Sequence, residues 1–377
     1  MKHKKIAAVI VTNVFFSKPE SFLSPLQKLG GTTVLDRLIN TFRDAGVNDI
    51  IVVLDERTAE LAPVLEQAEI RWVLDDEGRE GMIPSFRAGL ALLGAESESF
   101  FLSLVEMPLV RRTSLRDIIL AHDLSGKDVA YPTFFGERGF PILITAEHAE
   151  KLSRWNDSVE LNAFLEQFDS DAINVKVADE NILGFKDSYS PYQALMDRWK
   201  NYHIPSSSEC IALITDKFPL GVELLAHSKK VANLAVIMAQ ALNNRGYKLN
   251  LKLIEAAGFL HDIARGKPNH ASAAARLLRE IDYPVVADIV AAHMNLMVSE
   301  SEQISERDVV CFADKLVQGN CVVPLEIRFQ RKLDHYANDP VARAAIEKRL
   351  SNAKKLRRRI ETALGQPIES FFYGFKA

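Results

Sequence analysis

The second half of the chain places histidine and aspartate residues on the apolar faces of expected helices. His227 shares such a face with Leu224 and Val231, and the same pattern recurs in three later segments. The residues concerned are His227, the adjacent pair His261-Asp262, His293 and Asp314. One of these residues alone would be interpreted as a hydrogen-bonded core residue. Because an isolated buried charge costs several kcal/mol unless it is paired or binds a metal, four such helical sites on one interior predict a metal centre.

The order of these residues resembles a known family. His227, then His261-Asp262, then Asp314 is similar to the H…HD…D signature of the HD superfamily of metal-dependent phosphohydrolases, and the flanking segments AHSKKVANLA, GFLHDIARGK and CFADKLVQG agree with it. The resemblance covers roughly residues 207–335. It implies a helical domain in which His227, His261, Asp262 and Asp314 bind a divalent metal.

Two further histidines extend the pattern. His270 and His293 make it H…HD…H…H…D, which resembles the subgroup that holds two metals and includes hydrolases of dinucleotide polyphosphates and of cyclic dinucleotides. The GYP motif of the cyclic-dinucleotide enzymes is absent, so that activity is not supported. As alternatives, His270 is an exposed loop residue and His293 a core histidine.

The expected chemistry is metal-assisted hydrolysis at phosphorus. Imidazole and carboxylate donors suit Mn²⁺, Fe²⁺ or Zn²⁺, and one or two ions are expected. Such ions lower the pKa of a bound water, which then attacks phosphorus in line. Asp262 is the expected bridging ligand, and Asp262 and Lys267 are the expected catalytic residues. Arg265 and Lys315 also lie beside the ligands and are candidates for neutralising phosphoryl oxygens, with a solvated surface charge as the alternative for each cation.

The first two hundred residues alternate short apolar runs with amphipathic stretches. The expected strands are Ile6–Val11, Ile50–Leu54, Ile70–Leu74, Phe100–Leu104 and Val129–Tyr131, and helical patterns such as Thr33–Ala45 and Ile83–Leu93 lie between them. This rhythm predicts an α/β doubly wound domain with a mostly parallel sheet. After about Pro205 nearly every segment has a helical period, so we expect two domains, 1–203 and 204–377.

The first half also resembles a family, the molybdenum-cofactor nucleotidyltransferases, over about residues 4–200. The matching segments are SPLQKLGGTTVLDRLINTFRDAGVNDIIVVL, EGMIPSFRAGLALL, FLSLVEMPLV, PTFFGERGFPILI and DSYSPYQAL. The resemblance implies that Lys28, Gly81, Ser85 and Glu106 contribute to a weak nucleotide site in which Mg²⁺ is possible. Glu106 stands where the family has the aspartate of its Asp-Met-Pro motif.

The phosphate-binding loop departs from that family. A glycine-rich turn should follow the first strand, but the sequence there is VIVTNVFFSKPE. Glycine lets backbone N–H groups approach a triphosphate closely, whereas Phe15 and Phe16 add bulk. We therefore expect a nucleotidyltransferase-like domain whose catalysis is weakened or lost.

The composition of the chain argues against several other classes of protein. Hydrophobic residues make up 47% of the 377 residues, and the net charge is −4, which argues against a general nucleic-acid binder. The sequence contains no run of eighteen apolar residues, so it predicts no membrane-spanning helix. Three cysteines without a CxxC pair suit reduced thiols, so a cytoplasmic protein without a membrane partner is expected. A homo-oligomer stays open.

Three functions are compatible with these observations. The first is a metal-dependent phosphohydrolase that acts on a phosphorylated small molecule or nucleotide, joined to a degenerate nucleotidyltransferase-like domain. The second is a bifunctional enzyme that still transfers a nucleotidyl group to a molybdopterin-type acceptor. The third is a non-catalytic ligand sensor with a structural metal.

The altered loop generates a binding prediction. Residues 1–203 should bind GTP or CTP, with Mg²⁺ present, with a Kd no tighter than about 1 mM, or roughly −4 kcal/mol, because the loop lacks converging backbone donors. Calorimetric titration measures this constant. A micromolar Kd that weakens in Glu106→Ala and Lys28→Ala would contradict the prediction and favour the bifunctional enzyme.

Overall fold

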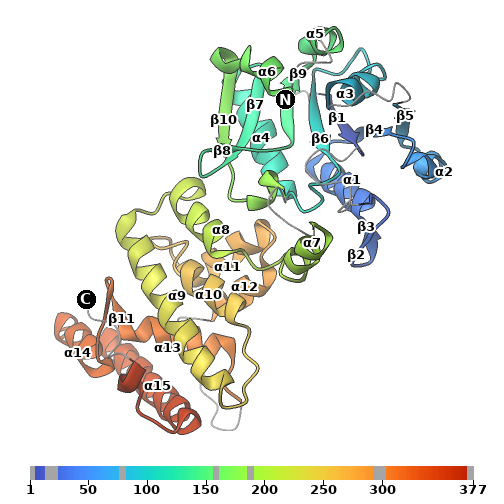
Figure 1. The fold of residues 1–377 in the computed structure, drawn as a ribbon. Helices are drawn as coiled ribbons and strands as arrows, with labels where there is room; N and C mark the ends of the chain where they lie inside the picture. The colour runs from blue at the N-terminus through green and yellow to red at the C-terminus, as the bar shows by residue number, and fades with distance from the viewer. Residues whose placement is uncertain are drawn as a thin grey trace. The chain divides into compact units, whose positions relative to one another are not determined.

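The computed structural model describes residues 5–12, 24–75, 82–155, 161–184, 191–292 and 303–371. The chain forms two compact units, Met1–Tyr202 and His203–Ala377 (Figure 1). The first is a mixed α/β unit and the second is mainly helical, as the sequence predicts.

The first unit is built on one sheet with the strand order β10-β7-β9-β6-β1-β4-β5 and with β8 paired to β7. The strands are β1 Ile6–Val11, β4 Asp49–Leu54, β5 Arg71–Leu74, β6 Ser99–Leu104, β7 Val129–Phe134, β8 Glu137–Arg138, β9 Ile142–Thr145 and β10 Ala172–Lys176. Each of the five strands expected from the sequence is present. Strand β1 pairs in parallel with both β4 and β6, whereas β9 runs antiparallel to β6 and β7. The sheet is therefore mixed, with a parallel central part.

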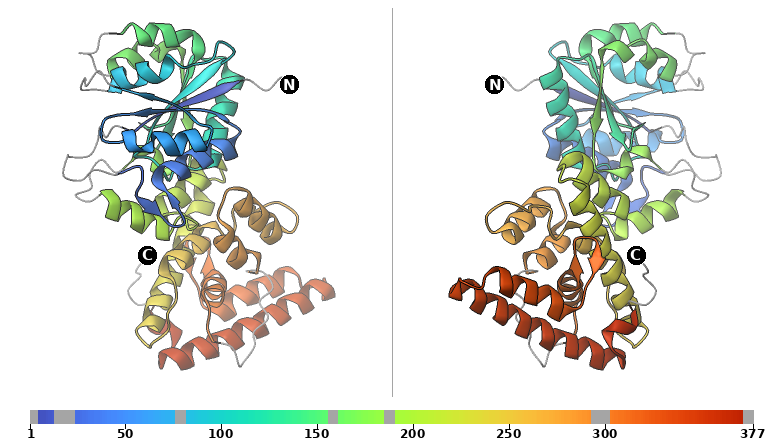
Figure 2. Two further views of the ribbon diagram at one scale, coloured as in Figure 1. Left: turned by 90° about the vertical axis from the view of Figure 1, so that its right-hand side faces the viewer. Right: turned by 90° about the vertical axis from the view of Figure 1, so that its left-hand side faces the viewer.

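Helices lie on both faces of this sheet (Figure 2). They are α1 Val34–Ala45, α2 Ala62–Gln67, α3 Met82–Leu90, α4 Arg112–Ser125, α5 Ala149–Ser153, α6 Leu161–Glu166 and α7 Pro191–Lys200, and a hairpin of β2 Lys28–Leu29 and β3 Thr32–Thr33 precedes α1. Residues Ala7–Val11 of β1 are fully buried, which explains the unbroken apolar run of that strand. Helix α3 packs directly on β1, because a Cβ at Gly89 would lie 2.4 Å from Val9 Cγ1.

The second unit is a bundle around α9. Its elements are α8 Ser207–Ala212, α9 Val222–Asn243, α10 Leu251–Leu260, α11 His270–Glu280, α12 Pro284–Ala291, α13 Glu306–Leu316, β11 Val317–Gln318, β12 Cys321–Val322, α14 Leu325–His335 and α15 Pro340–Leu364. Helices α10 and α13 pack against α9, and α14 packs against α15. Ser206 and Glu209 form a capping box that begins α8, since each side chain accepts a hydrogen bond from the backbone N–H of the other.

Two features of this unit were not expected from the helical periodicity of its sequence. Strands β11 and β12 form a short antiparallel hairpin that the helical periodicity does not indicate. Helix α12 ends at Ala291, and His293, which the sequence places on the apolar face of this helix, lies outside the described residues. Helix α15 is amphipathic and packs its apolar face inward, because Leu356 and Ile360 are buried.

The close contact between α9 and α10 sets the position of the residues that follow α10. A Cβ at Gly258 would lie 2.6 Å from the Ala232 Cα and 3.0 Å from its backbone nitrogen. Only glycine permits this approach, because backbone atoms cannot swing aside as a side chain can. Among the described residues, no helix is long and apolar enough to cross a membrane.

This contact predicts that Gly258→Ala is destabilising. The added methyl group must push α10 away from α9, so we expect a loss of about 1–3 kcal/mol in the free energy of unfolding of the helical unit. Chemical denaturation followed by circular dichroism measures the change. Gly94→Ala is the control, because the nearest atom to its Cβ would be a flexible glutamate oxygen at 3.5 Å and a change within about 0.5 kcal/mol is expected. Equal stability of the two variants would contradict the packing argument.

Candidate metal centre

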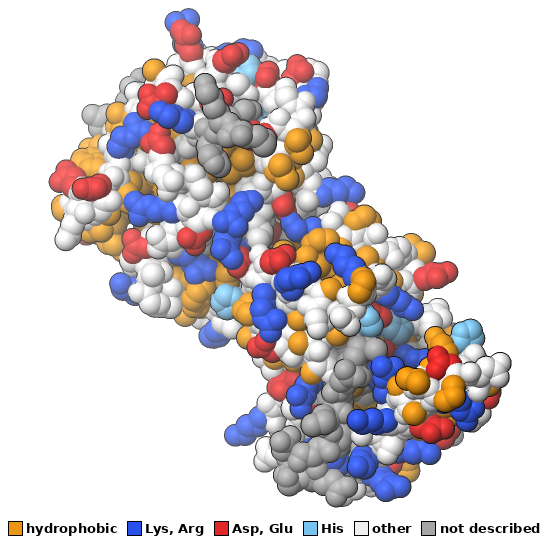
Figure 3. Space-filling view, turned by 180° about the vertical axis from the view of Figure 1, so that it is seen from behind, with side chains coloured by type: hydrophobic (Ala, Val, Ile, Leu, Met, Phe, Trp, Pro, Cys, Tyr) orange, Lys and Arg blue, Asp and Glu red, His pale blue; other side chains and the backbone are white. Residues whose placement is uncertain are grey.

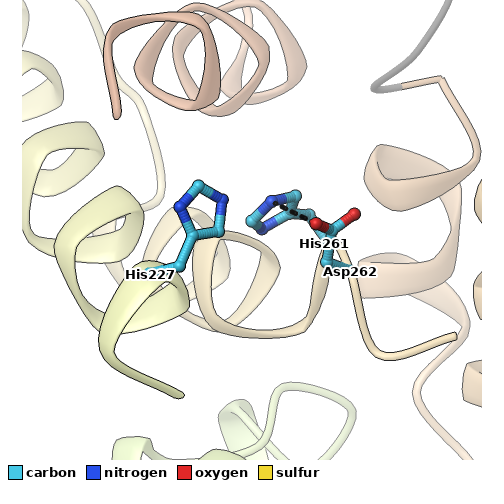
Figure 4. Close-up of side chains that lie close together, drawn as sticks. All are labelled: His227, His261 and Asp262. Carbon is cyan, nitrogen blue, oxygen red and sulfur yellow. Dashed lines mark ion pairs between the residues drawn. The ribbon is translucent and has the colours of Figure 1, made fainter. Parts of the chain in front are cut away.

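Two buried histidines from neighbouring segments face each other in the helical unit (Figure 4). His227 comes from α9, and His261 comes from the turn that directly follows α10. Their ring centroids lie 5.4 Å apart, and the two residues are 6% and 1% exposed. Side chains this deeply buried must have their polar atoms satisfied inside the protein.

Backbone carbonyls select the tautomer of both rings. The Nδ1 atom of His227 lies 2.9 Å from the Gly319 carbonyl oxygen, and Nδ1 of His261 lies 2.8 Å from the Gly258 carbonyl oxygen. Because a carbonyl oxygen only accepts, each Nδ1 carries the proton, and in the neutral ring Nε2 keeps its lone pair. This arrangement is typical of histidines that bind metals, since it orients the ring and directs Nε2 to the ion.

Three further ligand-type residues lie around these Nε2 atoms. His261 Nε2 is 3.7 Å from Asp262 Oδ2 and 3.8 Å from Asp314 Oδ1, and His227 Nε2 is 3.6 Å from the same Asp314 oxygen. His270 Nε2 is 3.5 Å from Asp262 Oδ1. The structure therefore brings together five of the six predicted ligands.

The nitrogen–oxygen separations of 3.6–3.8 Å in this cluster are longer than direct hydrogen bonds and lie at or slightly above those of two ligands of one ion. Two donor atoms that each lie about 2.0–2.2 Å from one metal are separated by about 3–3.6 Å at the usual angles. One ligand atom each from His227, His261 and Asp262 lies within 4.8 Å of the others. Imidazole nitrogens with carboxylate oxygens are the donor set of Mn²⁺, Fe²⁺ or Zn²⁺, so the residues fit a divalent transition metal.

Asp314 is held in its charged form. Burial alone would raise its pKa, but the neighbouring cations Lys315 and Arg328 bring the pKa well below the usual value for an aspartate. Lys315 Nζ lies 2.6 Å from Oδ2, and Arg328 Nη2 lies 3.4 Å from Oδ1. The carboxylate is therefore ionised and oriented while it contacts both histidines.

The cluster opens into a pocket of about 930 Å³ that lies wholly within the helical unit. His227, Asp262, His270 and Asp314 line one part of it. The cations along its walls are Arg265, Lys315, Arg328, Arg331, Lys332 and Arg349. In Figure 3, Lys and Arg side chains gather where histidine side chains reach the surface of this unit. Ligand-type residues beside many cations suit a phosphorylated substrate.

The structure places the other predicted residues of this half differently. Arg265 lines the pocket, and its Nη1 atom lies 3.7 Å from Asp262 Oδ2. Lys267 is exposed and is not among the residues that line the pocket, so its catalytic role stays a prediction. His293 lies outside the described residues.

The first unit gathers polar residues at one edge of its sheet. Thr12, Asp75 and Glu106 follow β1, β5 and β6, whose carboxyl ends meet at the same edge because these strands are parallel to their neighbours. Strand β1 lies between β4 and β6, so this is the point where the strand order reverses and α/β sheets bind ligands. All three residues are buried, and Ser85 donates a hydrogen bond of 2.7 Å to Asp75 Oδ2.

The remaining predicted nucleotide residues are only partly placed. Lys28 is exposed on β2, and its carbonyl oxygen accepts a hydrogen bond from Tyr192. Gly81 and the loop from Asn13 to Phe16 lie outside the described residues. Of the four residues predicted for the nucleotide site, Ser85 and Glu106 are therefore the two that lie at the carboxyl ends of the strands.

Comparison with known families follows the same division of the chain. Residues 25–172 match the MobA-like NTP transferase domain, and residues 224–318 match the HD domain. The chain joins a MobA-like domain to an HD domain. The HD match contains His227, His261, Asp262, His270 and Asp314, so it covers the cluster described above.

Individual proteins resemble parts of the chain. An uncharacterized protein of Methanocaldococcus jannaschii is 25% identical over 130 residues, which are 29% of this chain and 77% of that protein. Ribonuclease Y of Chlorobium luteolum is 34% identical over 125 residues, which are 31% of this chain and only 23% of the ribonuclease.

Solved structures resemble about half of the chain. A nucleotidyl transferase from Methanothermobacter has 20% identity and a TM-score of 0.44, with 52% of this chain and 98% of that chain covered. Molybdopterin-guanine dinucleotide biosynthesis protein A from Archaeoglobus fulgidus has 16% identity and a TM-score of 0.40, with 52% and 97% covered.

Some residues of the HD-domain pocket were not expected from the sequence. Arg328, Arg331 and Lys332 lie on α14, and Arg349 lies on α15, both after the end of the HD match. The spacing of the first three, i, i+3 and i+4, places them on one helical face and is the signal that could have revealed them. The Gly319-Asn320 turn of the β11–β12 hairpin was a further signal.

The centre predicts the metal content of the protein. Protein never exposed to a chelator should contain one or two transition-metal ions per chain, because the two Nε2 atoms and the nearby carboxylates form a donor set for them. Elemental analysis measures the content. In His261→Ala the content should fall at least about tenfold at equal free metal, whereas His335→Ala, which changes a pocket histidine on α14, should keep it. A metal-free protein of normal stability would count against the site.

Proposed function

We propose that the protein is a metal-dependent phosphohydrolase that acts on a phosphate ester or anhydride derived from a nucleotide. One observation carries this proposal. The HD cluster of histidines and aspartates lies in a pocket whose walls carry six cationic side chains. A divalent metal held by His227, His261, Asp262 and Asp314, with His270 beside Asp262, would activate water and polarise a phosphoryl oxygen.

The residues of the chain have distinct parts in this proposal. Asp262 is the carboxylate that lies between His261 and His270, at 3.7 and 3.5 Å, and so it is the residue suited to bridge two ions. Arg265 is largely exposed at the pocket and is available to neutralise phosphoryl oxygens. Lys315 and Arg328 hold Asp314 ionised and in place, so they are positioning residues.

A nucleotide-derived substrate is favoured by two further facts. Both domains belong to families named for, or acting on, phosphorylated compounds. A relative of part of this chain is named ribonuclease Y, although the chain spans only 23% of that protein. The substrate class is therefore proposed at the level of the nucleotide and not of the whole relative.

Nucleotidyl transfer by the MobA-like domain is the second candidate. The observation that favours it is the buried set of Thr12, Asp75 and Glu106 at the carboxyl edge of the sheet. Buried carboxylates at a strand-order reversal are suited to hold a magnesium ion beside a nucleotide. Glu106 in place of aspartate lengthens the arm by one carbon, and for this reason we rank the transferase second.

The phosphohydrolase is tested by removing its central carboxylate. Asp262→Ala should lower the metal-dependent release of p-nitrophenolate from p-nitrophenyl phosphate and from thymidine 5′-(p-nitrophenyl phosphate) by at least about 100-fold, since the bridging ligand is lost. Asp288→Ala changes an exposed carboxylate of the same unit that pairs with Arg279, and it should leave the rate unchanged.

The rates are to be compared with Mn²⁺, Fe²⁺ or Zn²⁺ supplied to chelator-treated full-length protein. Circular dichroism establishes that both variants remain folded. Unchanged turnover of Asp262→Ala at equal metal content would remove this residue from the mechanism. The absence of hydrolysis in the unaltered protein with all three metals would favour the non-catalytic sensor.

A further inference from the structure

Helices α14 and α15 form a cationic wall of the HD pocket, which also contains the carboxylates of the candidate metal centre. Of the residues that line the pocket, three are carboxylates, Glu223, Asp262 and Asp314, and two of these belong to the candidate metal centre. The positive charge of the pocket therefore exceeds what its own carboxylates neutralise, although the whole chain carries a net charge of −4.

Four of the six cations already have partners. Lys315 and Arg328 contact Asp314, and both side chains are only 13% exposed. Arg265 lies within 3.7 Å of Asp262, and Arg331 donates a hydrogen bond of 3.1 Å to Gln318. These contacts account for the cations next to the metal centre and beside the hairpin.

Lys332 and Arg349 differ from these four. Throughout the ranges that the structure describes, neither side chain has a carboxylate within 4.0 Å. Both residues are exposed to solvent, and both line the same pocket as the metal ligands. They are thus accessible cations, on two different helices, that face one cavity.

The electrostatics of Lys332 support this description. Its pKa is lowered from the usual value for a lysine, first because the pocket walls partly desolvate the ammonium group and then because Arg328 repels it. Asp314 opposes this shift, and Lys315 and Arg349 add weaker repulsion that lowers the pKa further. An anion bound among these cations would relieve the repulsion. Within a folded protein, accessible cations crowded in this way are suited to bind phosphate.

The packing of the two helices holds the cations in place. Phe329 of α14 and Ile346 of α15 are 3% and 5% exposed, and both contribute to the pocket lining. Helices α14 and α15 lie side by side, as the views in Figure 2 also show. This wall begins after residue 318, where the HD match ends, so the shared domain does not account for it.

We propose that Lys332 and Arg349 form a second phosphate subsite, and that the substrate is a nucleotide with a further phosphate group besides the one at the metal centre. The inference rests on the proposed phosphohydrolase function and narrows its substrate class. The exposed ring of Tyr336, which lines the same pocket, is of the kind that stacks on a nucleobase. The second phosphate of such a nucleotide is either linked to the first, as in a diphosphate, or attached to another position of the sugar.

Binding of three nucleotides tests the subsite directly. Calorimetry with full-length protein that carries its metal, without added free metal, compares thymidine 5′-monophosphate, thymidine 5′-diphosphate and thymidine 3′,5′-bisphosphate. We expect at least one of the two doubly phosphorylated compounds to bind at least about tenfold more tightly than the monophosphate. Preference for the diphosphate indicates adjacent phosphates, and preference for the bisphosphate indicates phosphates on the two sides of the sugar.

Substitutions then assign the preference to these two residues. Lys332→Met together with Arg349→Met should reduce the preference to less than about threefold while binding of the monophosphate is retained. Lys348→Met is the matched control, because Lys348 is an exposed neighbour of Arg349 that does not line the pocket, and the preference should persist. Equal binding of all three nucleotides, or an unchanged preference in the double variant, would overturn the subsite.

Hydrolysis separates this result from that for the proposed function. Thymidine 5′-(p-nitrophenyl phosphate) with and without a 3′-phosphate presents the same reacting bond and leaving group. Hydrolysis without any binding preference among the three nucleotides overturns the subsite alone. A binding preference without hydrolysis of either ester overturns the phosphohydrolase and leaves the phosphate subsite standing.

Discussion

The hydrogen bonds that tie two buried imidazole rings to backbone carbonyls are the interactions on which the helical unit depends. Each ring needs a partner for Nδ1, since an unsatisfied polar atom at this depth costs about 1–3 kcal/mol. Gly258 supplies the carbonyl for His261, and Gly319 supplies it for His227. The close approach of α10 to α9, which requires Gly258, and the β11–β12 hairpin, which contains Gly319, thereby fix where both Nε2 atoms point.

The charges around this centre act in two layers. Next to the histidines, Lys315 and Arg328 keep Asp314 ionised, so a buried carboxylate is available as a ligand at neutral pH. Farther along the pocket, α14 and α15 add cations that the carboxylates of the pocket do not neutralise. A chain with a net negative charge can therefore present a strongly positive cavity, because binding depends on local charge density and not on the total.

The MobA-like domain follows the same physical logic at a different place. Parallel strands around β1 bring residues that are far apart in the sequence, such as Thr12 and Glu106, to one edge of the sheet. Their burial there makes the edge a second place where a cation and a nucleotide could be held. Each domain thus contains a candidate site for a phosphorylated ligand. The structure describes more of the predicted site residues in the HD pocket than at the sheet edge.

Much of this organisation follows from the sequence by itself. The five expected strands, the helical second half and the order His227, His261-Asp262, Asp314 depend on residue type and short-range spacing, which are visible in one dimension. The capping box at Ser206 is equally local, since both of its partners lie within four residues. Local periodicity and capping decide which segments form helices, and the apolar stripes decide which faces turn inward.

Tertiary structure alone decided how the site is completed. The carbonyl that orients His227 comes from Gly319, 92 residues away, and Arg328 reaches Asp314 from a helix beyond the HD domain. Lys267 is only five residues from Asp262 in the sequence and Arg328 is fourteen from Asp314, but the fold leaves the first exposed outside the pocket and brings the second into it. The physical reason is that these contacts depend on how α9, α10, α13, α14 and the hairpin pack. Side-chain spacing within one segment shows which face turns inward but does not determine which other segment that face meets.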